Sequence, residues 1–162
     1  SPRSVRLTEG PMVGSQFLDF ASARSLALIA GVERKDVLLD RENKRAQATA
    51  QPLEGLTLAG YRELERRLER TVPGWTVELR PPLAALPEVT VGEDGLDAEN
   101  ATRLALIGWA AKRTGLRITL SGSDEALHEL NAVLGEDARF IDTRSEGQGN
   151  AVSAAWSTTT AR

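Results

Sequence analysis

His128 is the only histidine of the chain and the first side chain to consider for proton transfer. A catalytic base needs a partner that it activates or that orients it. The chain has no cysteine, so this partner would be a serine or a carboxylate brought close by folding. Helical spacing in the segment 127–130 places His128 beside the apolar positions and facing outward. Surface exposure is therefore the favoured interpretation, and a hydrolase that uses His128 is the least favoured of three functional hypotheses.

Two further segments resemble catalytic or cofactor motifs and have simpler interpretations. The segment 121–124 (Ser-Gly-Ser-Asp) lacks the second glycine of a nucleophile elbow, because Glu125 stands in its place. A helix cap accounts for Ser123. The Gly-Gln-Gly of residues 147–149 is too short for a dinucleotide fingerprint and precedes a predicted strand. We expect a hairpin turn there.

The sequence also offers few ligands for a metal. Asp40, Glu42 and Asn43 carry oxygen atoms, but their spacing does not match a calcium-binding loop and indicates a turn. Without cysteine there is no zinc–thiolate site and no disulfide. The sequence therefore predicts no catalytic residues, no metal and no cofactor, and hence a protein that is not an enzyme.

Composition limits the partners of this chain. Its 162 residues suffice for one domain or two small ones, and 41% of them are hydrophobic. The net charge of −3, with 20 basic residues interleaved with acidic ones, argues against nucleic acid as a partner. No apolar run approaches the roughly 20 residues that cross a bilayer. Nothing resembling a signal peptide follows the first serine, so we expect a mature or excised soluble piece, with no membrane insertion of this segment.

The first half is predicted to be an α-β-β-α-β unit over residues 16–82. Residues 1–15 are rich in proline, glycine, serine and arginine, which indicates a flexible arm or linker. A helix is expected from Ser22 to Gly31. Residues 36–40 and 45–50 flank a turn and predict a hairpin. An amphipathic helix over 56–70, capped by Thr57, and a strand over 75–79 complete the unit.

Prolines between residues 81 and 87 predict a stiff connector to a second unit over 83–162. This unit is expected to be β-α-β-α-β, with two helices that begin after Asp97 and Ser123. Its predicted strands cover residues 89–91, 116–120, 139–143 and 151–156. The resulting fold class is α/β, in the form of an α+β sandwich with two small units, each a sheet packed against helices.

Trp75, Trp109 and Trp156 are candidate interface residues. Half-exposed tryptophans mark interfaces more often than other residue types do. Trp109 lies toward the edge of the apolar stripe of its predicted helix, so partial exposure is one interpretation of this residue. Core packing is the alternative for each of the three, and the one we favour.

Residues 32–79 resemble the BON domain, a small envelope-associated module of bacterial proteins. The resemblance rests on Val37-Leu38-Leu39, on Gln47-Ala48-Thr49-Ala50 followed by Gly55, and on the helix end at 72–77 (Val-Pro-Gly-Trp-Thr-Val). It implies a helix packed with a β-β-α-β unit. The glycine that the family usually has in its second strand is not evident.

Residues 87–155 resemble the peptidoglycan-associating C-terminal domain of the OmpA family. The strand at 89–91, the helix from Asp97, and Ile118-Thr119-Leu120-Ser121-Gly122 before Asp124 carry this resemblance. The family holds the wall peptide with an aspartate and with an arginine on the following helix. Only Asp124 can be carried over, because residues 125–134 contain no arginine; Arg139 or Arg144 could substitute from a neighbouring strand. The resemblance implies a degenerate ligand site at Asp124, with Arg139 as second candidate.

The two resemblances imply a non-catalytic binding or scaffolding module of the bacterial cell envelope or periplasm. Its partners would be a protein, a second copy of itself or, weakly, peptidoglycan. The alternative is a cytoplasmic regulatory domain of ferredoxin-like build that binds a small ligand or self-associates. The identity of the partner, the compartment and the oligomeric state stay open at the level of sequence.

Overall fold

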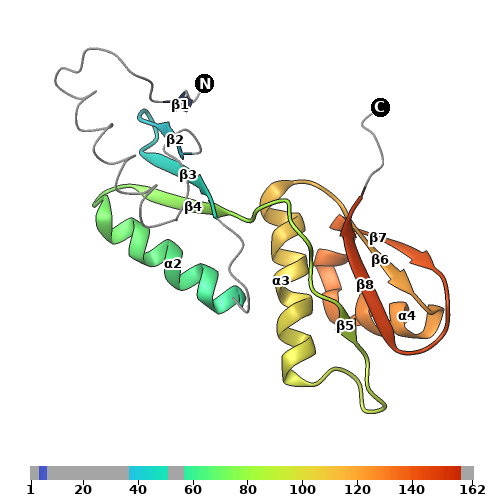
Figure 1. Cartoon of the computed structure of the whole chain (residues 1–162). Coiled ribbons are helices and arrows are strands. Elements are labelled where there is room, and N and C mark those ends of the chain that lie inside the picture. The colour runs from blue at the N-terminus through green and yellow to red at the C-terminus, as the bar shows by residue number, and fades with distance from the viewer. Residues whose placement is uncertain (1–3, 7–36, 51–56, 158–162) are drawn as a thin grey trace. The chain divides into compact units, whose positions relative to one another are not determined.

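The computed structural model describes residues 4–6, 37–50 and 57–157. The chain divides into two compact units, one from Ser1 to Pro82 and one from Leu83 to Arg162. This division falls within the proline-rich segment in which the sequence predicts a boundary. In the described part, the first unit is a sheet packed with one helix and the second a sheet packed with several, so the fold is α+β (Figure 1). The predicted helix over residues 22–31 lies outside the described residues.

The first unit contains a four-stranded sheet and one described helix. Its elements are β1 (Ser4–Arg6), β2 (Val37–Asp40), β3 (Arg45–Thr49), α2 (Leu58–Thr71) and β4 (Thr76–Arg80). The strand order is β1-β2-β3-β4. The pairs β1–β2 and β2–β3 are antiparallel, whereas β3 and β4 are parallel and connected through α2.

The predicted hairpin is confirmed as β2 and β3. Asp40 closes its turn, because its carboxylate accepts hydrogen bonds from the backbone and side-chain nitrogens of Asn43, at 3.2 and 2.9 Å. These oxygens thus serve the turn that the sequence predicts. The prediction of a flexible arm over residues 1–15 is wrong at Ser4–Arg6, because these residues pair with β2 as an edge strand. Three residues are too few to show a periodic sequence pattern, and their strand conformation comes from pairing with β2.

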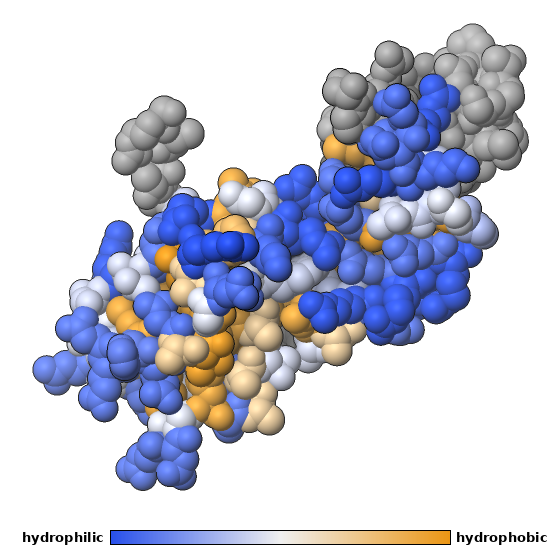
Figure 2. Space-filling model, turned by 180° about the vertical axis from the view of Figure 1, so that it is seen from behind, coloured by the Kyte–Doolittle hydropathy of each residue, from blue (hydrophilic) through white to orange (hydrophobic). Residues whose placement is uncertain are grey.

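Helix α2 forms where the sequence predicts an amphipathic helix. The hydroxyl of Thr57 accepts a hydrogen bond from the backbone N–H of Gly60 at 3.1 Å and caps the helix. Tyr61 and Leu68 are buried and Leu68 is fully enclosed, while the opposite face carries exposed charges. Seen from behind, the described surface of this unit is predominantly hydrophilic (Figure 2). Burial of one apolar stripe therefore positions α2 against β4.

The second unit has two long helices and a second four-stranded sheet. Its elements are β5 (Val89–Thr90), α3 (Ala98–Thr114), β6 (Ile118–Gly122), α4 (Asp124–Leu134), the 3-10 helix η2 (Gly135–Phe140), β7 (Ile141–Ser145) and β8 (Ala151–Trp156). The predicted caps Asp97 and Ser123 are confirmed, since each side chain accepts a backbone N–H three residues on. Gly115 ends α3 with a φ of 73°, a conformation that favours glycine. The strand predicted at 139–143 begins two residues later, because η2 includes Arg139 and Phe140.

The strand order of this sheet is β5-β8-β6-β7. Strands β7 and β8 are therefore not neighbours, and the prediction of a hairpin turn at residues 147–149 is wrong. Strand β7 pairs with β6 in parallel, and β8 pairs with the other side of β6 in antiparallel. The loop after Ser145 therefore crosses the end of β6 and does not join neighbouring strands. The composition of the strands gives the reason: Val152 of β8 is fully buried and needs a central position, whereas residues 142–145 of β7 are polar and suit an edge.

One face of this sheet forms the core of the second unit. Ile118, Leu120 and Val152 alternate with polar residues and are buried beneath the helices. Gly122 continues this face, where an added Cβ atom would lie only 3.0 Å from a methyl group of Val152. The other face carries hydroxyl and small side chains, among them Thr119, Ser121 and Ser153. The unit thus presents one apolar face to its helices and one polar face.

Candidate functional site

The carboxyl ends of β6 and β7 form the best-defined candidate site. The strands are parallel, and their register pairs Gly122 with Ser145 at their last residues. Helix α4 begins directly beyond this point, after Ser123. Ligands of α/β proteins commonly bind outside the carboxyl ends of parallel strands. Asp124, the wall-binding candidate of the sequence analysis, lies at this position.

Ser123 connects the start of α4 to the loop that follows β7. Its hydroxyl accepts the backbone N–H of Ala126 at 3.2 Å and donates to the carbonyl oxygen of Gly149 at 2.9 Å. Gly149 has a φ of 101°, which a residue with a side chain adopts only under strain. Ser123 therefore has a structural role, as the helix-cap interpretation predicted.

Asp124 is exposed at the first position of α4. One of its carboxylate oxygens accepts a short hydrogen bond from the hydroxyl of Ser145. Glu125 follows it and is exposed as well. Two adjacent carboxylates beside a hydroxyl favour ligand groups that donate hydrogen bonds or carry positive charge, such as an ammonium group.

Arg139, the second candidate, does not join Asp124. Because β6 and β7 run parallel, Arg139 precedes the start of β7 while Asp124 follows the end of β6. The guanidinium of Arg139 lies 4.9 Å from the centre of the Phe140 ring. Its carbonyl oxygen accepts a hydrogen bond from Arg117 at 3.0 Å. The structure therefore separates these two candidates by the length of the strand pair.

The three tryptophans differ in exposure. Trp109 is only 7% exposed, which confirms core packing, the favoured interpretation, over partial exposure. The reason is that α3 contacts β5, α4 and η2, which cover more of the helix than a single stripe. Trp75 and Trp156 are half-buried, and the indole N–H of Trp156 donates to the carbonyl oxygen of Ala84 at 3.0 Å. His128 is exposed, as predicted.

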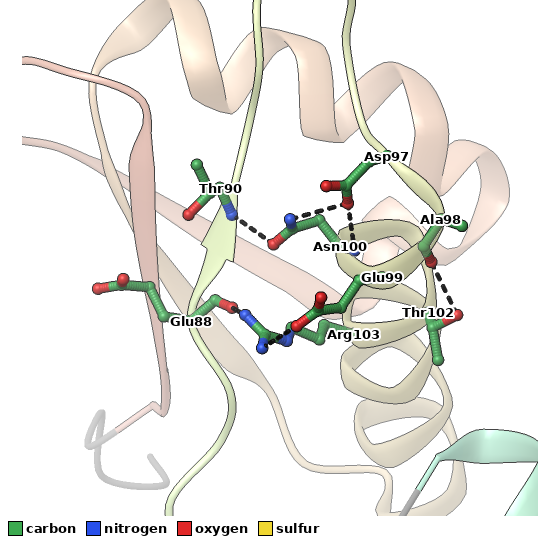
Figure 3. A network of polar contacts seen from close by, with 8 residues as sticks. All are labelled: Glu88, Thr90, Asp97, Ala98, Glu99, Asn100, Thr102 and Arg103. Atoms are coloured by element: carbon green, nitrogen blue, oxygen red, sulfur yellow. Dashed lines mark hydrogen bonds and ion pairs between the residues drawn. The ribbon is translucent and has the colours of Figure 1, made fainter. Parts of the chain in front are cut away.

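A polar network at the start of α3 contains the one buried polar residue of the described chain, Asn100 (Figure 3). The side-chain oxygen of Asn100 accepts the backbone N–H of Thr90 at 2.8 Å. Its backbone nitrogen and its amide nitrogen both donate to the Asp97 carboxylate, at 2.8 and 2.9 Å. The network thus fastens β5 to α3. Sequence reasoning missed Asn100, although the spacing Asp97-x-x-Asn100 matches that of a capping box.

Arg103 forms the second half of the network. Its guanidinium pairs with Glu99 at 2.5 Å and donates to the carbonyl oxygen of Glu88 at 3.3 Å. The hydroxyl of Thr102 donates to the carbonyl oxygen of Ala98 at 2.9 Å. Figure 3 shows that these groups point toward one another. We therefore assign the network to the positioning of β5 and not to ligand binding.

The pKa of Asp97 is lowered, first because its carboxylate accepts the backbone N–H of Asn100 and then because it accepts the Asn100 amide. A lowered pKa in the folded state contributes stability above the ordinary pKa, and this contribution is lost as the pH falls through the lowered value. We expect Asp97→Asn, which keeps an oxygen as cap, to weaken the acid dependence of the unfolding free energy. Urea unfolding from neutral pH to about pH 2 measures it. Asp94→Asn, at an exposed loop position, is the control, and an unchanged pH profile for Asp97→Asn would contradict the assignment.

Comparison of the chain with family models, with curated proteins and with solved structures gives no match. The resemblances to the BON domain and to the OmpA C-terminal domain therefore stay predictions. In the described part of the chain, no helix has the length and hydrophobicity needed to cross a membrane. No group of three or more histidine and acidic side chains among the described residues is placed to hold a metal ion.

Proposed function

We propose that the chain is a non-catalytic binding module of the bacterial cell envelope that contacts protein partners and, weakly, peptidoglycan. The observation that carries the wall contact is the exposed carboxylate of Asp124 at the carboxyl ends of β6 and β7. Ser145 holds this carboxylate through a hydrogen bond, so its position is defined without a ligand. Wall peptides carry ammonium and amide groups, which are the hydrogen-bond donors that a carboxylate accepts.

The wall contact is proposed as weak because the described residues around Asp124 include no arginine that faces it. Arg139 lies at the other end of β7. Arg144 neighbours Ser145, but alternation along the strand directs it to the opposite face of the sheet, beside Ser121. An arginine that grips a carboxylate of the ligand contributes about 1.5–3 kcal/mol. Its absence corresponds to an affinity about tenfold to a hundredfold lower.

Sedimentation with insoluble peptidoglycan tests the wall contact. We expect weak sedimentation that Asp124→Ala reduces about tenfold, because one charge-assisted contact is lost. Glu136→Ala removes an exposed carboxylate outside the site and should leave sedimentation unchanged. Strong sedimentation that survives Asp124→Ala would assign wall binding to another surface. No sedimentation of the unmodified protein would remove peptidoglycan from the proposal.

The envelope location is supported by the two resemblances and needs a separate test. The sequence of the complete gene supplies one: an upstream signal peptide or membrane helix is the expected finding. A fused catalytic domain without such a segment would contradict the envelope assignment and favour the regulatory alternative.

A further inference from the structure

Strand β4 is an edge of the first sheet, and two side chains of α2 block it. The N–H of Thr76 donates to the carbonyl oxygen of Lys44, in the turn before β3, at 2.9 Å. The main-chain N–H of Thr76 thus points toward β3, and in a ladder the N–H groups of the alternate residues Val77 and Leu79 point away from it. The outward N–H of Val77 donates to the Glu69 carboxylate at 3.1 Å, and that of Leu79 to the Glu65 carboxylate at 2.7 Å. These donors are therefore already satisfied and cannot recruit another strand.

Strand β5 is an edge of the second sheet and is blocked in the same way. The N–H of Thr90 donates to the side-chain oxygen of Asn100 at 2.8 Å (Figure 3). The strand is also only two residues long, which is a further protection of an edge. Side chains of α2 and α3 thus accept the outward N–H groups of the edge strands β4 and β5.

Strand β7 is the opposite edge of this sheet, and no helix side chain covers its outward N–H groups in the described residues. Its outward carbonyl at Ile141 accepts one hydrogen bond, from the Arg117 side chain at 3.5 Å, and keeps a second lone pair for another donor. The N–H of Glu146 donates to the carbonyl oxygen of Gly122 at 2.8 Å, which sets the phase of the parallel ladder. The N–H groups of Thr143 and Ser145 consequently point away from β6. Among the described residues, no side chain accepts either of them, and Thr143, Arg144 and Ser145 are all exposed.

We propose that β7 pairs antiparallel with β7 of a second copy of the chain, about a two-fold axis at Thr143. In this register the two Thr143 residues exchange both of their main-chain hydrogen bonds, and the N–H of Ser145 faces the carbonyl of Ile141 in the other copy. The two sheets then continue as one, with the helices of both copies on the same side. A closed two-fold dimer results, because each edge is used once.

Charge complementarity selects this partner and this register. Asp142 of one copy lies directly opposite Arg144 of the other, and the reciprocal pair repeats across the axis. These residues form a non-hydrogen-bonded pair, in which the side chains of opposing strands approach most closely. Asp142 is already oriented by Arg117 at 2.9 Å and Ser157 at 3.0 Å, and a carboxylate has room for further donors.

The expected association is reversible and depends on concentration. Strand addition over five residues buries a small area, and interfaces below about 1,200 Å² are typical of weak or transient complexes. The contact uses neither Asp124 nor peptidoglycan. This inference and the proposed wall contact can therefore fail independently of each other.

Disulfide cross-linking of the full chain tests the register, because the natural sequence has no cysteine. In Thr143→Cys the two new cysteines should face each other across the axis and form an intermolecular disulfide under mild oxidation. Ser153→Cys is the matched control, as Ser153 is exposed on β8 inside the sheet and should stay reduced. Cross-linking of Ser153→Cys with none of Thr143→Cys would overturn the proposal in favour of face-to-face stacking.

Sedimentation velocity over a concentration series tests the contacts. Thr143→Pro removes an outward donor that β6 does not use, and Arg144→Glu places two carboxylates opposite each other. Each should raise the dissociation constant of the dimer at least about tenfold. Arg62→Glu reverses an exposed charge on α2 and should leave it unchanged. A protein that stays monomeric at every concentration, or a dimer that survives both changes, would overturn the proposal.

Discussion

Replacing Leu68 by alanine should lower the unfolding free energy of the first unit by about 2–5 kcal/mol, the range for large cavities in a packed core. Leu68 is fully buried on α2, against the sheet that contains Val77 and Leu79. The second unit should keep its stability, because the chain divides into two compact units between Pro82 and Leu83. Hydrogen exchange of the full chain measures both effects, since β3 and β4 should lose protection while β6 and β8 keep theirs.

Leu120→Ala is the reciprocal variant. Leu120 is 1% exposed in β6, so the same loss of about 2–5 kcal/mol should appear only in the second unit. Limited proteolysis should cut the unmodified chain between residues 83 and 88, where Leu83 is 67% exposed, and leave two protected fragments. Loss of protection in both units after either substitution would show that they unfold as one.

Asn100→Leu should destabilise the second unit by about 1–3 kcal/mol, although the substitution adds apolar volume to a buried position. The amide of Asn100 is the acceptor for Thr90 and a donor to Asp97. Without this amide, the N–H of Thr90 on the edge strand β5 loses its hydrogen-bond acceptor, because a leucine side chain has none. Chemical unfolding followed by the fluorescence of Trp109 and Trp156, both in this unit, measures the loss.

Two further variants separate the hydrogen bonds from other effects. Asn131→Leu makes the same exchange at an exposed position of α4 and should change stability by no more than about 0.5 kcal/mol. Asn100→Asp keeps an acceptor for Thr90 but places a second carboxylate beside Asp97, so it should destabilise most at neutral pH and less in acid. Equal stabilities for Asn100→Leu and the unmodified protein would contradict the positioning role.

The sequence by itself determined the local elements of this protein. Thr57, Asp97 and Ser123 cap their helices as predicted, because a cap depends on residues only two or three positions apart. The hairpin of β2 and β3 was predictable for the same reason, since two alternating strands flank a four-residue turn. The presence of both helices and strands in each half of the chain was likewise predictable, and the structure has the α+β class.

Only the tertiary structure decided how distant elements combine. Strand β8 pairs with the far side of β6, so the loop at 146–150 is not the hairpin that its glycines indicate. The parallel course of β6 and β7 separates Asp124 from Arg139, and the layers around α3 bury Trp109. Pairing between strands and covering of helices are contacts between residues far apart in the chain. A local pattern specifies which face of an element is apolar, but not which element covers it.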